Sequence, residues 1–253
     1  MNPNIQIIRY EECESSLWKN GGGSTKQLLI WPKGADLSNF DFRISIATIS
    51  SDGPFSLFHG IDRQLCILEG EGVKLHIKGN DLGQTEEIIL RPNDPPFCFS
   101  GETQIESKLL VNQILDFNVM TRRGKYRACI EQLELDDPFS LESTNTSRED
   151  NVHQSTNPHN NKLQQWLLCL EPLNLLYQGQ TIQLKRYDMM QYLQWPDSKT
   201  QLSEIQRLKA TALKITSSEA EQSETKHTDI KNQHTVHHRQ CQLLRIIIVR
   251  NDI

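Results

Sequence analysis

Long apolar runs are absent from this sequence of 253 residues. The longest, Leu243–Val249, is interrupted by Arg245 and suits a buried strand, whereas a membrane-spanning helix needs about 20 apolar residues. The first ten residues also lack the basic start, the apolar stretch and the small-residue cleavage site of a secretory signal. These absences predict a cytoplasmic protein with no membrane partner.

An excess of basic residues is missing as well. The chain has 27 Lys and Arg against 32 Asp and Glu, a formal net charge of -5, and its basic residues are spread along the sequence. Proteins that hold nucleic acid present a concentrated positive surface to the phosphates. We therefore expect no nucleic-acid partner.

Residue spacings typical of metal sites are not found. His59 and His76 are isolated, no HxH or HxxxH pair occurs in a strand-like segment, and no two of the six cysteines form a CxxC motif. Three histidines between His234 and His238 fall in a polar stretch and are expected to be solvated. The sequence thus predicts no metal and no cofactor, and it predicts cysteines that are reduced and buried in strands.

What the sequence does contain is a succession of short strand-like segments separated by turn residues. They are Thr25–Trp31, Phe42–Ser50, Gln64–Leu68, Val73–Ile77, Glu87–Leu90, Lys108–Asn118, Gln165–Leu170, Thr181–Tyr187, Met189–Trp195, Leu208–Ile215 and Cys241–Val249. No long helical periodicity lies between them, which predicts an all-β sandwich or barrel.

Two polar stretches divide these strands. Residues 140–161 and 216–240 contain too few apolar side chains to order themselves by burial. We therefore predict a first strand domain over residues 1–139, a flexible connection over 140–162, and a second strand set over 163–253 that carries a polar insert at 216–240.

Alternation along two strands selects candidate site residues. Arg43 and Ser45 share one face of Phe42–Ser50, opposite apolar side chains, so they lie either in solvent or inside a barrel. Asp116, Asn118 and Arg122 share a face of a later strand. These three side chains could bind a polar ligand, or they could form a structural network that ties a strand end to a loop.

Two further segments add candidates. Trp18 and Asn20 precede the glycine run Gly21–Gly23, which allows close approach of a ligand or forms a tight turn. Arg63 follows Asp62 and precedes the apolar strand Gln64–Leu68, so it forms either a local ion pair or a buried cation facing an anionic ligand. The glycine run lacks the spacings of phosphate-binding loops.

Several segments together resemble the HutD/Ves family. They are Trp18–Thr25, Phe42–Ala47, Gly53–Ser56, Phe58–Arg63, Leu68–Gly70 and Asp116–Arg122, and their order and spacing extend across the first half of the chain. The resemblance implies a cupin-like (RmlC-type) β-barrel or jelly roll, with two barrels in one chain and a connection to histidine utilisation. It also favours an interior position for Arg43 and Ser45. The sequence departs from the family pattern at His59, where proline is commoner, and in its two polar stretches.

Three functions remain open at this point. The first is metal-independent binding of a small polar or anionic metabolite by Trp18, Asn20, Arg43, Ser45, Arg63, Asp116, Asn118 and Arg122. The second is a metal-independent isomerase or lyase for a small carboxylated substrate, with Asp116 as base and Arg43 or Arg63 holding the anion. The third is a protein-interaction module that uses the polar stretches. A homodimer is compatible with all three.

Overall fold

The computed structural model describes residues 6–78, 85–133, 163–177, 180–194, 212–213 and 243–251. Strands dominate these residues, and within them the only helical segment is the 3-10 turn η1 (Tyr10–Glu12), so the all-β prediction is confirmed. No helix among the described residues has the length and apolar character needed to cross a membrane. Residues 140–161 and 216–240, predicted to be polar connections, lie outside the described residues.

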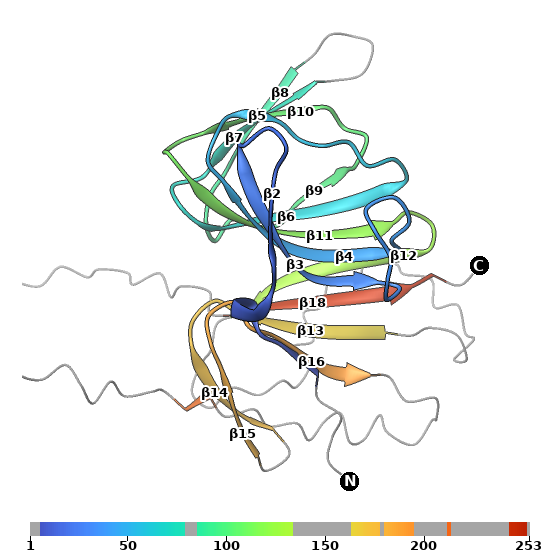
Figure 1. Cartoon of the computed structure of the whole chain (residues 1–253), viewed down its shortest axis with the longest axis vertical. Helices are drawn as coiled ribbons and strands as arrows, with labels where there is room; N and C mark the ends of the chain where they lie inside the picture. The colour runs from blue at the N-terminus through green and yellow to red at the C-terminus, as the bar shows by residue number, and fades with distance from the viewer. Residues whose placement is uncertain are drawn as a thin grey trace, which may run out of the picture.

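A six-stranded antiparallel sheet, here called the middle sheet, forms the centre of the molecule (Figure 1). Its strands, in spatial order, are β2 (Ser15–Leu17), β3 (Gly23–Trp31), β4 (Phe42–Ile49), β11 (Ile114–Arg122), β6 (Ile61–Glu69) and β9 (Phe97–Ser100). β11 lies between β4 and β6, and its residues are buried from Ile114 to Thr121. A strand buried on both of its faces must be covered by a layer on each side.

The upper sheet covers one face of the middle sheet and lies above it in Figure 1. Its strands, in spatial order, are β5 (Gly53–Pro54), β10 (Ile105–Leu109), β7 (Val73–Lys78) and β8 (Thr85–Leu90). Apolar side chains from both sheets, including Leu65, Ile67, Val73 and Leu75, form a common buried cluster. The two facing antiparallel sheets make the first barrel, and the cupin-like prediction is confirmed for this part of the chain.

The lower sheet covers the opposite face of the middle sheet. Its strands, in spatial order, are β1 (Gln6–Ile8), β16 (Met189–Gln194), β13 (Leu163–Cys169), β18 (Leu243–Arg250) and β12 (Tyr126–Leu133). Phe117 and Val119 of β11 share a buried cluster with Trp166, Leu244 and Ile246 of the lower sheet. A smaller sheet of β14 (Leu173–Tyr177), β15 (Gln180–Leu184) and β17 (Ala212–Leu213) lies at the foot of Figure 1.

The lower sheet joins strands from both ends of the sequence. β12 pairs with β18 and β1 pairs with β16, so two strands of the predicted domain 1–139 are hydrogen-bonded to strands of the predicted set 163–253. The two groups therefore share one sheet. The domain boundaries near residue 140 and the second barrel stay predictions, because residues 134–162, 195–211 and 214–242 lie outside the described residues.

Two details predicted from the sequence were wrong. The segment Lys108–Asn118 forms two strands, because the chain bends after Leu109 to cross from the upper to the middle sheet. At that bend the Leu109 N–H donates to the Asp52 carboxylate at 2.8 Å. The predicted burial is correct for Cys66 and Cys169 and wrong for Cys98 and Cys129, which are exposed; the five described cysteines carry reduced thiols.

Candidate functional site

Five of the predicted site residues lie together inside the first barrel. Alternation on β4, β11 and β6 turns one set of side chains toward the upper sheet, and the strand register places these side chains side by side. Ser45 is paired with Asn118, and Met120 has Arg43 on one side and Arg63 on the other. Ser45 is buried, which excludes the solvent-facing alternative for this face of β4.

Arg63 is enclosed by aromatic rings. Its guanidinium carbon lies 4.7 Å from the ring centre of Phe99, 5.4 Å from that of Phe55 and 5.7 Å from that of Phe58. Nη1 donates to the carbonyl oxygen of Ser56 at 3.2 Å, but buried Nε has no hydrogen-bond partner. Burial lowers the pKa of Arg63 to about 10, against the opposing effect of Asp116, so the side chain stays cationic at neutral pH.

Arg43 lies on β4, on the opposite side of β11 from Arg63, and its side chain enters the same interior. Its Nε donates to Oε1 of Gln27 at 3.0 Å, and its Nη1 donates to Oγ of Ser45 at 3.2 Å and contacts Sδ of Met120 at 3.8 Å. Burial lowers the pKa of Arg43, and Asp116 acts in the opposite direction. All three contacts are to neutral groups, so the cation is held in position without a carboxylate bonded directly to it.

Asp116 is the anion of this interior, and it is 4% exposed. Burial raises its pKa to about 7, while Arg63, the backbone N–H of Ala47 and Arg43 act to lower the pKa. Its Oδ1 has no hydrogen-bond partner, and neither has Oδ1 of Asn118, which is 7% exposed. Buried polar atoms are nearly always bonded, so these unpaired atoms mark a position suited to a polar ligand.

The charges and unpaired atoms together define what this interior can do chemically. Two guanidinium groups and one carboxylate give it a net positive charge when Asp116 is ionised. Arg63 Nε can donate to an anion, whereas Oδ1 of Asn118 and Oδ1 of Asp116 can accept from a hydroxyl, an amide or a protonated acid. A small carboxylate with one donor group matches this set.

Two predicted residues lie at the hairpin between β2 and β3. Trp18 is partly buried against the apolar cluster of the first barrel, and its Nε1 donates to Oγ1 of Thr25 at 2.8 Å. Asn20 is exposed, and its Oδ1 accepts from the Gly22 N–H at 3.1 Å, which closes the turn. Trp18 therefore borders the barrel interior, while Asn20 shapes the hairpin.

Arg122 continues the face of Asp116 and Asn118 but lies beyond the barrel interior. Its Nε and Nη2 donate to the carbonyl oxygen of Phe40 at 3.0 and 2.6 Å, and Nε lies 3.8 Å from Oδ1 of Asp41. It thus ties the end of β11 to the loop before β4, the structural alternative considered for this strand. Asp62 does not pair with Arg63, since it faces the other way and binds Arg123 at 2.7 Å.

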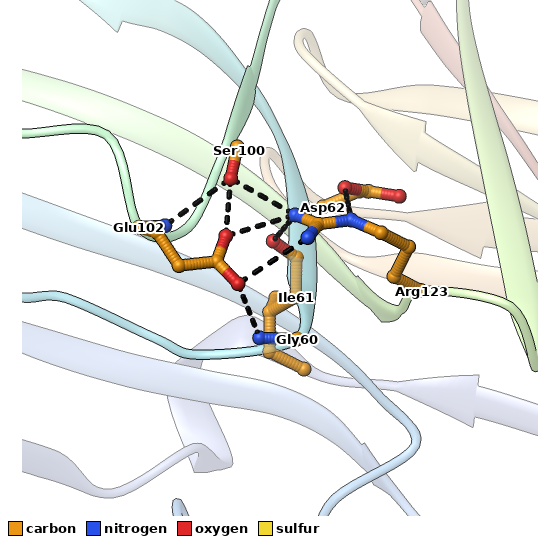
Figure 2. Close-up of polar contacts among 6 residues, drawn as sticks. All are labelled: Gly60, Ile61, Asp62, Ser100, Glu102 and Arg123. Carbon is orange, nitrogen blue, oxygen red and sulfur yellow. Dashed lines mark hydrogen bonds and ion pairs between the residues drawn. The ribbon is translucent and has the colours of Figure 1, made fainter. Parts of the chain in front are cut away.

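Arg123 is the centre of a polar cluster at the edge of the first barrel, here called the rim network (Figure 2). Besides Asp62, it donates to Oε2 of Glu102 at 2.9 Å, Oγ of Ser100 at 2.9 Å and the carbonyl oxygen of Ile61 at 3.2 Å. Oε1 of Glu102 also accepts from the Gly60 N–H at 2.6 Å. These bonds hold the start of β6 and the end of β9 in place around Arg63, and they depress the pKa of Glu102.

Metal-binding groups are not gathered in the described part of the chain. No three His, Cys, Asp or Glu side chains among these residues lie close enough to hold an ion. The predicted absence of a metal stays a prediction.

A family model supports the resemblance that the motifs predicted. The HutD model matches residues 10–190, which is more than half of the chain. The chain belongs to the HutD family. The matched residues include β3, β4, β6 and β11, and thus every strand that supplies Arg43, Arg63 and Asp116.

Relatives in the HutD and Ves group are similar over about half of this chain. The 21.2 kDa protein in the hutC 3′ region of Pseudomonas putida is 38% identical over 127 residues, which cover 50% of this chain and 63% of the relative. Protein Ves of Citrobacter koseri is 34% identical over 114 residues, which cover 45% of this chain and 56% of the relative. The chain therefore spans less than two thirds of the length of each.

Two solved structures share the fold of this chain. HutD from Pseudomonas fluorescens SBW25 superposes with a TM-score of 0.61 at 19% identity, covering 98% of this chain and 100% of that one. A conserved protein of unknown function from Pseudomonas aeruginosa PAO1 gives a TM-score of 0.63 at 20% identity, with the same coverage. At these identities the likeness shows the fold alone.

Sequence reasoning missed several contributors to the site of this HutD-family chain. Phe55 and Phe58 come from the loop between β5 and β6, and Phe99 comes from an edge strand, so no shared periodicity connects them. The alternation Phe97-Cys98-Phe99 was the available signal for an inward aromatic face. Gln27 was missed because its partner, Arg43, lies on a different strand.

Gly101 lies against the loop between β5 and β6 that carries Phe55 and Phe58, and a substitution there tests how tightly this loop is packed. A Cβ atom at Gly101 would overlap the carbonyl oxygen of Phe58 and approach that of Ile61 to 2.9 Å. We expect Gly101→Ala to displace Phe58 and to lower the free energy of unfolding by about 1–3 kcal/mol, measured by urea denaturation. Gly53→Ala is the matched control, because its Cβ would meet nothing within 4 Å. Equal effects of the two substitutions would contradict this account of the loop.

Proposed function

We propose that this HutD-family protein binds a small carboxylated metabolite inside its first barrel, on Arg43 and Arg63. The observation that carries the proposal is the set of buried unpaired atoms, Arg63 Nε, Asp116 Oδ1 and Asn118 Oδ1, beside two cations. A buried charge without a bonded counter-ion is costly, and an anionic ligand would remove that cost.

The chemistry of the enclosure also supports a small anion. Three phenyl rings surround Arg63, so a ligand beside it would be shielded from water and its charge would be weakly screened. The names of two relatives, HutD and the protein in the hutC 3′ region, connect those proteins with the hut genes. Metabolites of histidine utilisation are small and carboxylated, which fits this interior.

The first experiment is a thermal-shift screen with acetate, lactate and succinate, since a ligand that binds only the native state raises its melting temperature. Binding constants then follow from calorimetric titration of wild type and variants. We expect Arg43→Ala to weaken binding about 10- to 100-fold, the effect of losing a hydrogen bond to a charged group. Arg43→Lys should also weaken binding, because lysine lacks the planar fork of the guanidinium.

Arg127→Ala is the matched control for these variants. Arg127 lies exposed on β12, so its removal changes the net charge equally and should leave affinity unchanged. Absence of binding by all three carboxylates, or equal affinity in folded Arg43→Ala, would refute the proposed site.

A second candidate function is metal-independent isomerisation or elimination with Asp116 as general base. The observation in its favour is the pKa of Asp116 near 7, since a base is most effective when its pKa is close to the working pH. A turnover assay with histidine-pathway metabolites separates the two functions. Loss of turnover in Asp116→Asn with retained binding would favour the enzyme.

A further inference from the structure

We propose that the first barrel takes up a proton together with its carboxylate ligand, because Asp116 must become neutral before a second carboxylate can lie between Arg43 and Arg63. This inference rests on the proposed function and adds a rule for when the site is filled. It concerns Asp116, the buried acid of this interior, whose protonation state the proposed binding mode does not specify.

Asp116 and an anionic ligand would interact with the same two cations, Arg43 and Arg63. Its strand, β11, lies between β4, which carries Arg43, and β6, which carries Arg63, and both arginines act electrostatically on its carboxylate. Among the described residues these two arginines are the only charged side chains that affect the pKa of Asp116. The backbone N–H of Ala47 also lowers this pKa. An ionised Asp116 thus partly neutralises the cations that a ligand would use.

Two carboxylates in one buried site cannot both remain ionised without a large cost. Like charges at short range in a medium of low dielectric constant raise the pKa of one of the two acids. Asp116 is the acid that accepts the proton most readily, because burial already holds its pKa near 7 in the ligand-free protein. A free carboxylate such as acetate titrates far below this value.

Protonation also satisfies atoms that are otherwise unpaired. A neutral Asp116 carries one O–H donor, which can be given to the ligand carboxylate or to Oδ1 of Asn118. The proton adds to an oxygen of Asp116, no other covalent bond changes, and solvent supplies the proton. The complex then contains two cations, one ligand anion and one neutral acid, the same net charge as the ligand-free site at high pH.

The direction of the pH dependence follows from linkage. Bound carboxylate raises the pKa of Asp116 above its ligand-free value of about 7, so affinity is constant below that pH. Above it, each pH unit should weaken binding by up to about tenfold until the pKa of the complex is reached. Arg63, whose pKa is about 10, stays mainly protonated up to about pH 9.

The experiment titrates the full-length protein with acetate from about pH 6 to about pH 9, using NMR chemical shifts for the affinity. Calorimetry in HEPES and in Tris measures proton uptake, because the two buffers have different ionisation enthalpies. We expect affinity to fall as pH rises and up to one proton to enter per acetate bound. In Asp116→Asn, which is neutral at every pH, both effects should vanish, and binding at high pH should exceed that of wild type.

Glu86→Gln is the control, since Glu86 lies exposed on β8, outside the barrel interior and the rim network, and should leave the pH profile unchanged. Should Asp116→Asn fail to fold, the proton uptake of wild type still decides the question. Acetate binding with constant affinity and no proton uptake would overturn this inference and leave the proposed function intact. Absence of acetate binding at every pH, with no other carboxylate bound, would overturn both.

Discussion

Replacing Arg63 by methionine is expected to weaken the binding free energy of a carboxylate by about 2–5 kcal/mol, so that binding becomes too weak to detect by calorimetric titration. Arg63 is the most deeply buried cation of the first barrel, being 8% exposed, and it holds one of the unpaired donors. Calorimetric titration with acetate or succinate measures the loss. Methionine is unbranched, so it can fill the space among Phe55, Phe58 and Phe99.

The fold should survive this change, because methionine fills the space of the arginine stem and Asp116, having lost one nearby cation, can take up a proton and become neutral. Arg63→Lys separates charge from shape: it keeps the cation but loses the planar group that stacks on the rings. Arg127→Met, on the exposed face of β12, controls for the altered net charge. Wild-type affinity in folded Arg63→Met would remove Arg63 from the site.

Truncating Trp166 to alanine is expected to lower the free energy of unfolding by about 3–5 kcal/mol, the range for large aromatic side chains in cores. Trp166 lies on β13 of the lower sheet, is 1% exposed, and shares a buried cluster with Phe117 and Val119 of the middle sheet. Because this cluster joins strands from both ends of the chain, the described part should unfold in one cooperative transition.

Urea denaturation followed by circular dichroism measures both quantities. Leu17→Ala is the matched control, since Leu17 is 86% exposed on β2 and should change stability by less than about 0.5 kcal/mol. Two separate transitions, or an equally small effect of Trp166→Ala, would show that the lower and middle sheets do not share a core.

The fold class was accessible from the sequence because strand length and turn chemistry are local. Asn, Asp, Gly and Pro clusters end strands through backbone geometry alone, so most of the predicted segments match strands within a few residues. The prediction of one continuous strand over Lys108–Asn118 was wrong, because the break in this segment has no local cause. Its bend depends on bonds to Asp52 and Gly72, which are distant in sequence and leave no local signal.

Alternation by itself determined which side chains share a face, and it correctly grouped Arg43 with Ser45 and Asp116 with Asn118. It could not determine what each face meets. Both faces of β4 and β11 are buried, one by the upper sheet and one by the lower, so the usual distinction between a core face and a solvent face does not apply. The family resemblance favoured an interior position for Arg43 and Ser45, and the tertiary structure showed which sheet covers this face.

Alternation also could not distinguish the environments of the arginines. Arg63 and Arg123 differ little as sequence features, yet one is enclosed by three phenyl rings and the other is held at the surface by Asp62, Glu102 and Ser100. Arg122 shares the face of Asp116 but lies past the end of the barrel, where it binds the carbonyl oxygen of Phe40. The sequence alone determined the residue types and their spacing along each strand. Their partners were decided by sheet packing, because electrostatic and hydrogen-bonding contacts depend on distance in space, and residues far apart in the chain supply them.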